Sequence, residues 1–364
     1  MFPLIALLGR GEAPVDGVED YCELLSTAVG RLGAPLRIFR VHWQDVGWIR
    51  ALRELRQSSK DWRGGWVLIQ FTALAWSRRG FPFGALAVLA ILRRRGVRCA
   101  VVFHDPFRQY GTGPISYFRG ACQEWIIRRM HDRADKCIFL DPLPSIPWLA
   151  RDDSKSTFIP IGSNVPERVS NTVDAFEAGG KTPAVAVFCL SGAPYLHREL
   201  EDLLSASQAA KVEGAKFKIV FLGRGTVEAR EKIQKLFEGS AIEISNLGLR
   251  PAAEISDTLA KCSAMLCVRG PVYPRRGSAI AGIACGLPVL GYAGGAKGTP
   301  LEEAGLVLVP FRDTTALGNA LARVLGNRDL QQELRRRSME AQRNYFSWEL
   351  IGAAYVKFLE AAPR

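Results

Sequence analysis

The chain has 364 residues, 48% of them hydrophobic and 23% charged, which argues against a disordered protein and suits two globular domains. Forty-eight Lys and Arg against 36 Asp and Glu give a formal charge of +12, which favours anionic partners: phosphorylated substrates, nucleic acid or anionic lipid. The longest apolar stretch, residues 81–92, falls short of the roughly 20 residues that span a membrane, and residues 2–8 are too short for a secretory signal.

In chain order, the first half alternates short apolar runs with helical patterns. Near-continuous apolar strands separated by helices are typical of a parallel sheet covered on both faces. Strands are predicted at residues 2–8, 36–41, 66–71, 99–103 and 136–140, and helices at residues 18–31, 84–95 and 121–134.

The alternation stops at residues 160–183, which are rich in Gly, Pro, Asn and Ser and are the predicted linker. It then restarts, so two doubly wound halves are expected. Ligands of such sheets bind beyond the carboxyl ends of the strands, which places a cleft between the halves. In the second half, strands are predicted at 184–190, 217–222, 241–245, 264–268, 288–292 and 306–309, and helices at 198–211, 226–237, 252–261, 279–285, 315–325 and 330–345.

The eight cysteines and four histidines show no metal-binding spacing, and no Cys-x-x-Cys occurs. Most cysteines lie in apolar stretches, which indicates small buried side chains in a reducing compartment and no disulfide framework. We therefore expect no metal site and a cytoplasmic protein.

A first candidate anion site lies where Gly277 and Ser278 follow Arg275 and Arg276 and precede the apolar run AIAGIAC. Ser278 is a good N-cap, and Gly277 allows close approach of the backbone. A helix N-terminus beside arginines predicts a diphosphate site. An ordinary capped helix with exposed arginines is the alternative.

Three more strand or helix ends carry candidate residues. Gly223, Arg224 and Gly225 follow the strand FKIVFL, where the glycines permit a tight turn and the arginine can pair with a phosphate; a plain turn is the alternative. His104 ends the strand CAVVF and can hydrogen-bond a sugar or phosphate, unless its neighbours satisfy it. Gly17 begins the first long helix, either as a second anion-binding helix end or as a plain helix start with an acidic first turn.

Over most of its length the sequence resembles the family-4, retaining glycosyltransferases of the GT-B fold. Three segments of the second half carry the likeness: ISNLGLRPAAEISDTLAKCSAMLCV, GSAIAGIACGLPVLGYAGG, and GLVLVPFRDTTALGNALARVL with the later FSWEL. In the first half, the segment that ends in CAVVFHDPF resembles the family's surroundings of a cleft histidine. The resemblance is strong from about residue 240 to 350 and weaker before that.

The resemblance implies an α/β GT-B fold, with two Rossmann-like doubly wound domains facing a central cleft. Residues 1–165 would be the acceptor domain and residues 166–345 the donor domain, and residues 346–364 would form a helix that packs back toward the first. The implied reaction moves a sugar from a UDP- or GDP-linked donor to a saccharide or lipid-linked acceptor in bacterial surface polysaccharide or glycoconjugate synthesis. Retention of configuration and independence of metal or other cofactors come with the family.

The resemblance also implies roles for the candidate residues. His104 would position the sugar, and Arg224 and Arg276 would stabilise the leaving diphosphate. The remaining donor-binding candidates share a place at a strand or helix end of the expected cleft: Gly17, Arg198, Gly223, Gly225, Leu249, Gly277 and Ser278.

The sequence departs from the family at two places. Most members carry two glutamates eight residues apart near the donor, and here Tyr273 and Ala281 occupy those positions. After the strand AVAVFCL the family has Arg and then Lys about six residues later. This chain has Ser191 and then His197-Arg198, so Arg198 or His197 would replace the lysine while the arginine is missing.

Aromatic and basic residues gather beside the longest apolar stretch: Trp76, Arg78, Arg79, Phe81 and Phe83. They suit contact with the anionic inner face of a membrane and with a lipid-linked acceptor. A core helix with a basic loop is the alternative. A non-catalytic GT-B scaffold of a polysaccharide-assembly complex, or a sugar-nucleotide epimerase, are further alternatives. Nucleic acid is not an expected partner, because the chain has no recognised binding module.

Overall fold

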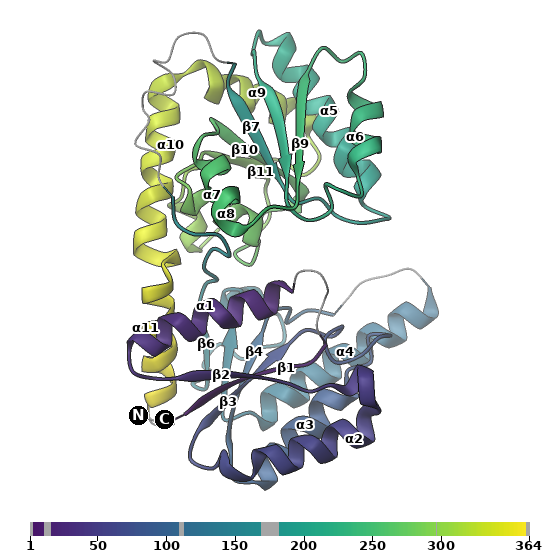
Figure 1. The fold of residues 1–364 in the computed structure, drawn as a ribbon, viewed down its shortest axis with the longest axis vertical. Helices are drawn as coiled ribbons and strands as arrows, with labels where there is room; N and C mark the ends of the chain where they lie inside the picture. Colours follow the sequence, from purple (N-terminus) through teal and green to yellow (C-terminus); the bar gives the residue numbers. More distant parts are fainter. Residues whose placement is uncertain (1–2, 11–15, 109–112, 169–181, 296, 362–364) are drawn as a thin grey trace. The chain divides into compact units, whose positions relative to one another are not determined.

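The structure is a computed structural model that describes residues 3–10, 16–108, 113–168, 182–295 and 297–361. The chain forms two compact units, one of Met1–Ile161 with Trp348–Arg364 and the other of Gly162–Ser347. Each unit contains a parallel six-stranded sheet with helices on both faces (Figure 1). Much of the predicted linker, residues 169–181, lies outside the described residues.

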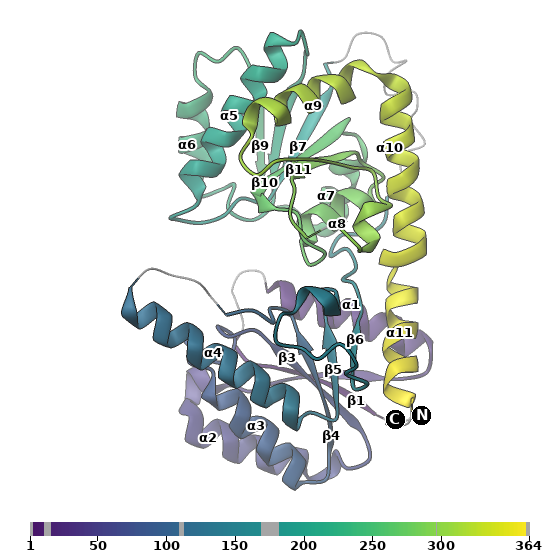
Figure 2. The ribbon, with the colours of Figure 1, turned by 180° about the vertical axis from the view of Figure 1, so that it is seen from behind.

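The sheet of the first unit has the strand order β2-β1-β3-β4-β5-β6. Its central strands are buried along their length because both faces are covered by helices, as their unbroken apolar sequences predict. Helices α2, α3 and α4 lie on one face and α1 and α11 on the other (Figures 1 and 2). The strands are β1 (Leu4–Leu8), β2 (Leu36–Arg40), β3 (Trp66–Phe71), β4 (Arg98–Phe103), β5 (Lys136–Phe139) and β6 (Ser156–Phe158), and the helices are α1 (Gly17–Arg31), α2 (Trp43–Ser58), α3 (Phe83–Arg94), α4 (Pro114–Arg133) and α11 (Trp348–Glu360).

The C-terminal helix α11 belongs to the first unit although it follows the second unit in the chain. The hydroxyls of Tyr21 and Tyr355 meet at 2.7 Å in the buried seam between α1 and α11. Gly352 lets the helices approach, because a Cβ there would stand 3.0 Å from the Ala28 side chain. Lys136 of β5 donates to the Ala361 carbonyl, 2.6 Å away, at the end of α11, where a cation is favourable.

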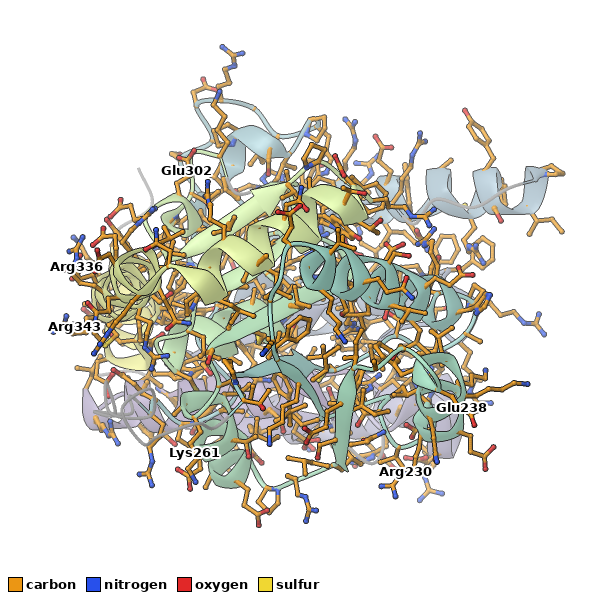
Figure 3. The ribbon with its side chains drawn as sticks, turned by 90° about the horizontal axis from the view of Figure 1, so that it is seen from above. Arg230, Glu238, Lys261, Glu302, Arg336 and Arg343 are labelled. Carbon is orange, nitrogen blue, oxygen red and sulfur yellow. The ribbon has the colours of Figure 1, made fainter. Side chains whose placement is uncertain are left out.

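The sheet of the second unit has the order β12-β11-β10-β7-β8-β9, so β7 lies between β10 and β8. Charged side chains point outward around this unit (Figure 3). Its strands are β7 (Ala184–Phe188), β8 (Lys218–Leu222), β9 (Glu243–Gly248), β10 (Ala264–Pro271), β11 (Val289–Tyr292) and β12 (Leu306–Val309), and its helices are α5 (Leu196–Val212), α6 (Arg230–Phe237), α7 (Ala252–Ala260), α8 (Gly277–Ala284), α9 (Thr314–Gly326) and α10 (Arg328–Ala341), followed by a π-helical turn, Gln342–Phe346.

Apart from shifts of a few residues at element ends, the structure differs from the predicted elements at four places. It contains a helix, α2, and a short edge strand, β6, that the pattern did not predict, and α4 begins at Pro114 and not at residue 121. Residues 226–229 form turns, so α6 begins at Arg230. In α2 the left-handed Gly47 (φ 77°) interrupts the helix, which breaks the apolar period on which the prediction depends.

Trp76 is a core residue, which corrects its assignment to a membrane-facing surface. The side chain is fully buried, and its Nε1–H donates to the Gln70 carbonyl at 2.9 Å. Trp48 stacks between it and Trp43, with ring centroids 6.5 and 5.0 Å away. The indole therefore fills the space between β3 and α2, where its polar group is satisfied.

Candidate functional site

Arginines gather at the carboxyl edge of the second sheet, where β10, β7 and β8 lie side by side. Arg269, near the end of β10, points its Nε toward the Ser191 hydroxyl, 3.4 Å away and just beyond β7. Arg224 follows β8, and its carbonyl accepts a hydrogen bond from Leu190 at 2.9 Å. Residues from three strands therefore meet at the edge where doubly wound sheets bind their ligands.

Arg276 lies in the same group and is half-buried at the start of α8. Its Nη2 donates to the Pro271 carbonyl at 3.2 Å. Burial first, and then the like charges of Arg269 and Arg275, lower the pKa of the Arg276 guanidinium. Cations that disfavour one another in a partly desolvated place are stabilised by an anion, so the pKa shift and the geometry both point to an anion site.

A neutral thiol and a carboxylate border the arginines. Burial raises the pKa of the Cys267 thiol to about 11 against the opposing effect of Arg276 and Arg269, so the thiol is neutral. The buried Glu199 carboxylate accepts a hydrogen bond from the Ser191 amide at 2.8 Å. Its charge acts on Arg276, so the site has one nearby carboxylate that partly balances the cations.

Helix α8 begins at Gly277, and Arg276, not Ser278, is its N-cap, which corrects the predicted cap. Ser278 is buried in the first turn, and its hydroxyl interacts with the Cys267 thiol. Among the described residues, no side chain makes a capping hydrogen bond to this helix end. The positive end of α8 is therefore open to an external acceptor beside Arg276.

Gly223 and Gly225 have left-handed backbones, with φ of 89° and 82°. A Cβ on Gly225 would stand 2.4 Å from the Leu190 carbonyl oxygen, and one on Gly223 would stand 2.7 Å from the Phe188 ring. The glycines thus allow this turn to pack against the end of β7, and Arg224 stands exposed between them.

Arg198 and Leu249 lie at the ends of neighbouring elements without joining the arginine group. The Arg198 guanidinium sits 5.6 Å from the centroid of the Tyr195 ring on the exposed first turn of α5. It makes no hydrogen bond or ion pair within the described part of the chain. Leu249 follows β9 and is 43% exposed, an apolar surface where a flat base could rest.

Tyr273 and Ala281 stand where the glycosyltransferases that the sequence resembles have two glutamates. Ala281 is buried within α8. The Tyr273 ring lies 5.3 Å below the Arg275 guanidinium and packs so closely on Gly295 that a Cβ there would be 2.7 Å away. Tyr273 therefore supports the arginine loop against the Gly294-Gly295 turn.

In the first unit, His104 follows β4 and is mostly enclosed. Its Nε2 lies 2.7 Å from the Gln70 amide oxygen, and its ring meets Tyr21 edge-on at 5.3 Å. Burial lowers the pKa of the imidazole to about 4, so it is neutral near pH 7. The Gln70 amide nitrogen donates to the Leu68 carbonyl, which leaves its oxygen as the acceptor for His104. On this network Nε2 carries the proton and Nδ1 is an acceptor.

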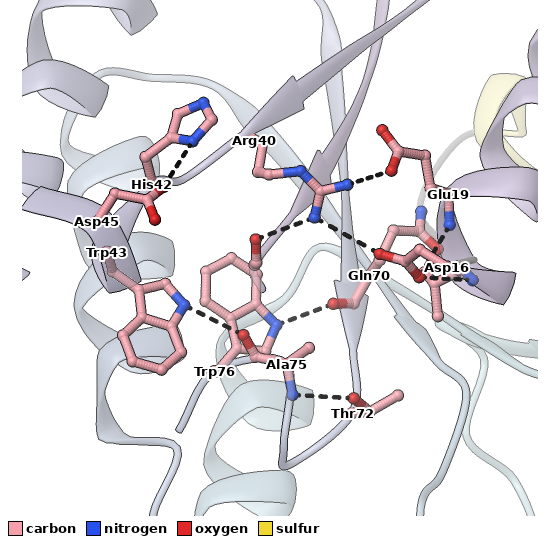
Figure 4. A network of polar contacts seen from close by, with 12 residues as sticks. Asp16, Glu19, Arg40, His42, Trp43, Asp45, Gln70, Thr72, Ala75 and Trp76 are labelled. Atoms are coloured by element: carbon pink, nitrogen blue, oxygen red, sulfur yellow. Dashed lines mark hydrogen bonds and ion pairs between the residues drawn. The ribbon is translucent and has the colours of Figure 1, made fainter. Parts of the chain in front are cut away.

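The N-terminus of α1 already faces a carboxylate (Figure 4). Asp16 Oδ1 accepts hydrogen bonds from the amides of Val18 and Glu19 at 3.0 and 3.3 Å. Arg40 binds Glu19 at 2.6 Å and approaches Asp16 Oδ2 at 3.6 Å. The carboxylates of Asp16 and Glu19 oppose a phosphate at Gly17, and Arg40 balances only part of their charge, so this helix end suits a hydroxyl-bearing ligand better than an anion.

Within the residues that the structure describes, no helix is long and apolar enough to cross a membrane. No three His, Cys, Asp or Glu side chains within the described ranges are grouped as ligands for a metal ion.

Arg269 and Asp16 were not identified from the sequence. Arg269 directly follows the apolar run AMLCV, the same signal that identified Arg224, so the pattern could have found it. Asp16 carried only the signal of an N-cap, and its place near His104, whose pKa it acts on, depends on tertiary packing.

No family model and no curated protein matches the sequence. Among solved structures the chain is similar to a sucrose-phosphate synthase from Thermosynechococcus elongatus, with 17% identity, a TM-score of 0.72, and coverage of 99% of this chain and 98% of that one. It is also similar to a glycosyltransferase from Rickettsia africae (12% identity, TM-score 0.70, 99% of each chain). A third is Anabaena HepE in complex with UDP and glucose (14% identity, TM-score 0.69, 100% of each chain). At these identities the likeness establishes the fold: this chain has the two-domain, Rossmann-like GT-B architecture.

Proposed function

We propose that this protein is a glycosyltransferase that moves a sugar from a nucleotide-sugar to a saccharide or lipid-linked acceptor. The observation that carries the proposal is the meeting of Arg269, Arg276 and the uncapped N-terminus of α8 at the carboxyl edge of the second sheet. The GT-B fold and the family-4 resemblance support the same reaction.

The chemistry follows from where negative charge develops. As the bond between the sugar and the diphosphate breaks, charge builds on the departing phosphate oxygens. Preorganised cations and amide groups stabilise that charge more in the transition state than in the ground state. Arg276 and Arg269 would contact the diphosphate with the amides of Gly277 and Ser278, while the exposed Arg224 would approach from the next strand. From the family resemblance we propose that the reaction proceeds without a metal ion.

Arg269 addresses the second departure from the family, the missing arginine after β7. The family's arginine would stand at the position of Ser191, and Arg269 brings a guanidinium to that position from the neighbouring strand, 3.4 Å from the Ser191 hydroxyl. A diphosphate could replace this weak hydrogen bond and accept hydrogen bonds from both the Arg269 guanidinium and the Ser191 hydroxyl. Arg198, whose side chain lies over Tyr195, would need a rotamer change to join them.

His104 would bind the sugar through Nδ1, which accepts a hydrogen bond from a hydroxyl, while Gln70 holds the ring in place. A neutral imidazole suits this role because a carbohydrate offers many donors and little charge. We propose retention of configuration from the family resemblance, with no protein nucleophile assigned.

The donor is proposed to be UDP- or GDP-linked, with its base over Leu249. Anabaena HepE was solved with UDP-glucose, and Staphylococcus aureus MnaA with UDP, which favours UDP among the candidates. The acceptor and pathway follow the resemblance to enzymes of bacterial surface polysaccharide or glycoconjugate synthesis. We place the enzyme in the cytoplasm, peripherally at the inner face of the membrane.

A thermal-shift screen against UDP, GDP, ADP and dTDP sugars tests donor binding, because a ligand of the native state raises the melting temperature. Incubation with the stabilising donor and analysis of released nucleotide then test catalysis. The replacement of both family glutamates by Tyr273 and Ala281 favours a second candidate, a non-catalytic scaffold that binds the donor. Stabilisation without sugar transfer or donor hydrolysis would select that candidate, and no stabilisation by any nucleotide would refute both.

A further inference from the structure

Large apolar side chains stand exposed together on α3 and α4 of the first unit. Single exposed apolar residues are common, but a cluster marks an interaction surface. Two pairs of rings within it are in contact: Phe83 with Trp125 at 6.4 Å and Phe118 with Phe81 at 6.1 Å. The exposed members are Ile115 (76%), Tyr117 (71%), Phe118 (62%), Phe83 (52%) and Trp125 (49%).

A groove of about 510 Å³ lies between α2 and α3. Its apolar lining is Ile49, Leu52 and Ile91, and the described residues that line it include no acid. Arg95 spans the two helices, because its Nη2 donates to the Arg56 carbonyl at 3.1 Å. Four arginines complete the lining: Arg53, Arg56, Arg94 and Arg95.

The charge of this region is predominantly positive, although α2 also carries Asp45 and Glu54 and α4 carries Asp132; Arg50 binds Glu54 at 3.0 Å. Residues 77–95 contain five arginines and no Asp or Glu. On α4, Glu124 is bound by Arg128 at 2.7 Å and approached by Arg108 at 3.9 Å, so it is already balanced. Arg129 lies 5.6 Å from the Trp125 ring centroid, which places a cation beside an exposed aromatic.

The three helices lie side by side on one face of the first sheet (Figures 1 and 2), so the aromatic cluster and the arginine groove belong to one surface. We infer that this surface, the α2–α4 face, docks on an anionic lipid bilayer. Aromatic and aliphatic side chains would enter the headgroup region while the arginines pair with lipid phosphates. The groove fits the same partner, because an apolar floor below an arginine rim matches an acyl chain below a phosphate.

The α2–α4 face is thus the surface, and an anionic bilayer the partner, for the peripheral membrane location proposed above. The inference rests on that proposed location and not on the proposed donor or reaction. It replaces the membrane contact expected around Trp76, which is buried. Phe83 is retained from that expectation, and the contact extends to α4 and to the groove.

The test is flotation of the full chain with vesicles of phosphatidylglycerol and phosphatidylcholine, and with vesicles of phosphatidylcholine alone. We expect binding to the anionic vesicles at low salt and much weaker binding to the neutral ones. Arg53→Gln with Arg94→Gln should weaken binding by about twenty-five-fold, at roughly fivefold per arginine. Tyr117→Ser with Phe118→Ser should weaken it by about tenfold or more, and high salt should not rescue that variant.

Matched controls come from the second unit. Val212 is 85% exposed on α5, so Val212→Ser removes an equally exposed apolar side chain, and Lys232→Gln with Lys235→Gln removes two exposed cations from α6. Both controls should float like the unchanged protein. The melting temperature of each variant, measured alongside, should stay within a degree or two, because every altered side chain is exposed.

Equal flotation of the two α2–α4 variants and the unchanged protein would refute the inference, as would equal binding to neutral and anionic vesicles. A doubled mass in light scattering that only Tyr117→Ser with Phe118→Ser abolishes, without flotation, would assign the surface to a second copy of the chain and refute it too. Donor-induced thermal stabilisation is measured on the same samples. It should persist in all variants, so loss of vesicle binding and failure of the donor site are distinguishable.

Discussion

Replacing Arg276 by alanine is the most direct test of the candidate donor site. Two opposite charges about 4 Å apart interact by ~4 kcal/mol at the effective dielectric constant typical of such sites. Arg276 is half-buried, and Arg269 and Arg224 would remain, so part of the stabilisation survives. We expect a loss of ~1.4–4 kcal/mol in transition-state stabilisation, a ten- to thousandfold fall in kcat/KM.

The assay is release of nucleotide from the donor identified by thermal shift, with kcat and KM measured separately. A contact that strengthens in the transition state lowers kcat, whereas a contact equal in both states raises KM alone. Arg276→Lys should recover part of the activity, because it keeps the charge and loses the planar fork.

The matched control is Arg336→Ala, which removes an exposed arginine of α10 bound to Glu333 and Glu340 and should leave kcat/KM unchanged. The melting temperature of Arg276→Ala should fall little, since the lost hydrogen bond to Pro271 is offset by relief of repulsion from Arg269. Unchanged kinetics with the correct donor would refute the role of Arg276, and a large loss of stability would show that its role is structural.

Three further predictions test other parts of the structure. Arg269→Ala should weaken donor binding about tenfold in calorimetry, whereas Ser191→Ala should change it less than threefold; a larger effect at Ser191 would contradict the proposed substitution for the family arginine. Because the pKa of His104 is lowered to about 4, the unfolded chain binds its proton first, so stability should fall as pH drops from about 6.5 to 4, by up to ~3 kcal/mol. His104→Gln should remove that slope in denaturant titrations, and an unchanged slope would place it elsewhere. Gly225→Ala should destabilise the second unit by at least ~2 kcal/mol, because the new Cβ would meet the Leu190 carbonyl and the backbone there is left-handed. The control Gly30→Ala, whose Cβ would meet nothing within 4 Å, should be neutral or stabilising. Equal melting temperatures of the two variants would be inconsistent with the clash.

The alternation of strands and helices could be predicted because burial of a sheet on two faces leaves a continuous apolar run in the sequence. β3 was predicted with its observed bounds, Trp66–Phe71, and so was β12, Leu306–Val309. Helix α2 was not predicted because Gly47 interrupts its apolar period. The first turns of α4 were not predicted because they are exposed and have no buried apolar stripe.

The sequence alone determined which residues can stand at strand ends and turns. Glycines at 223 and 225, an arginine beside Gly277, and a histidine after a buried strand are local facts, set by backbone geometry and residue chemistry. Only the tertiary structure decided their partners. The strand order brings Arg269 to Ser191, 78 positions earlier, and burial makes His104 neutral. Packing turns Trp76 inward and joins Tyr355 to Tyr21. The protonation state, burial and long-range contacts of a side chain depend on which elements become neighbours. The apolar period of one segment does not indicate which elements those are.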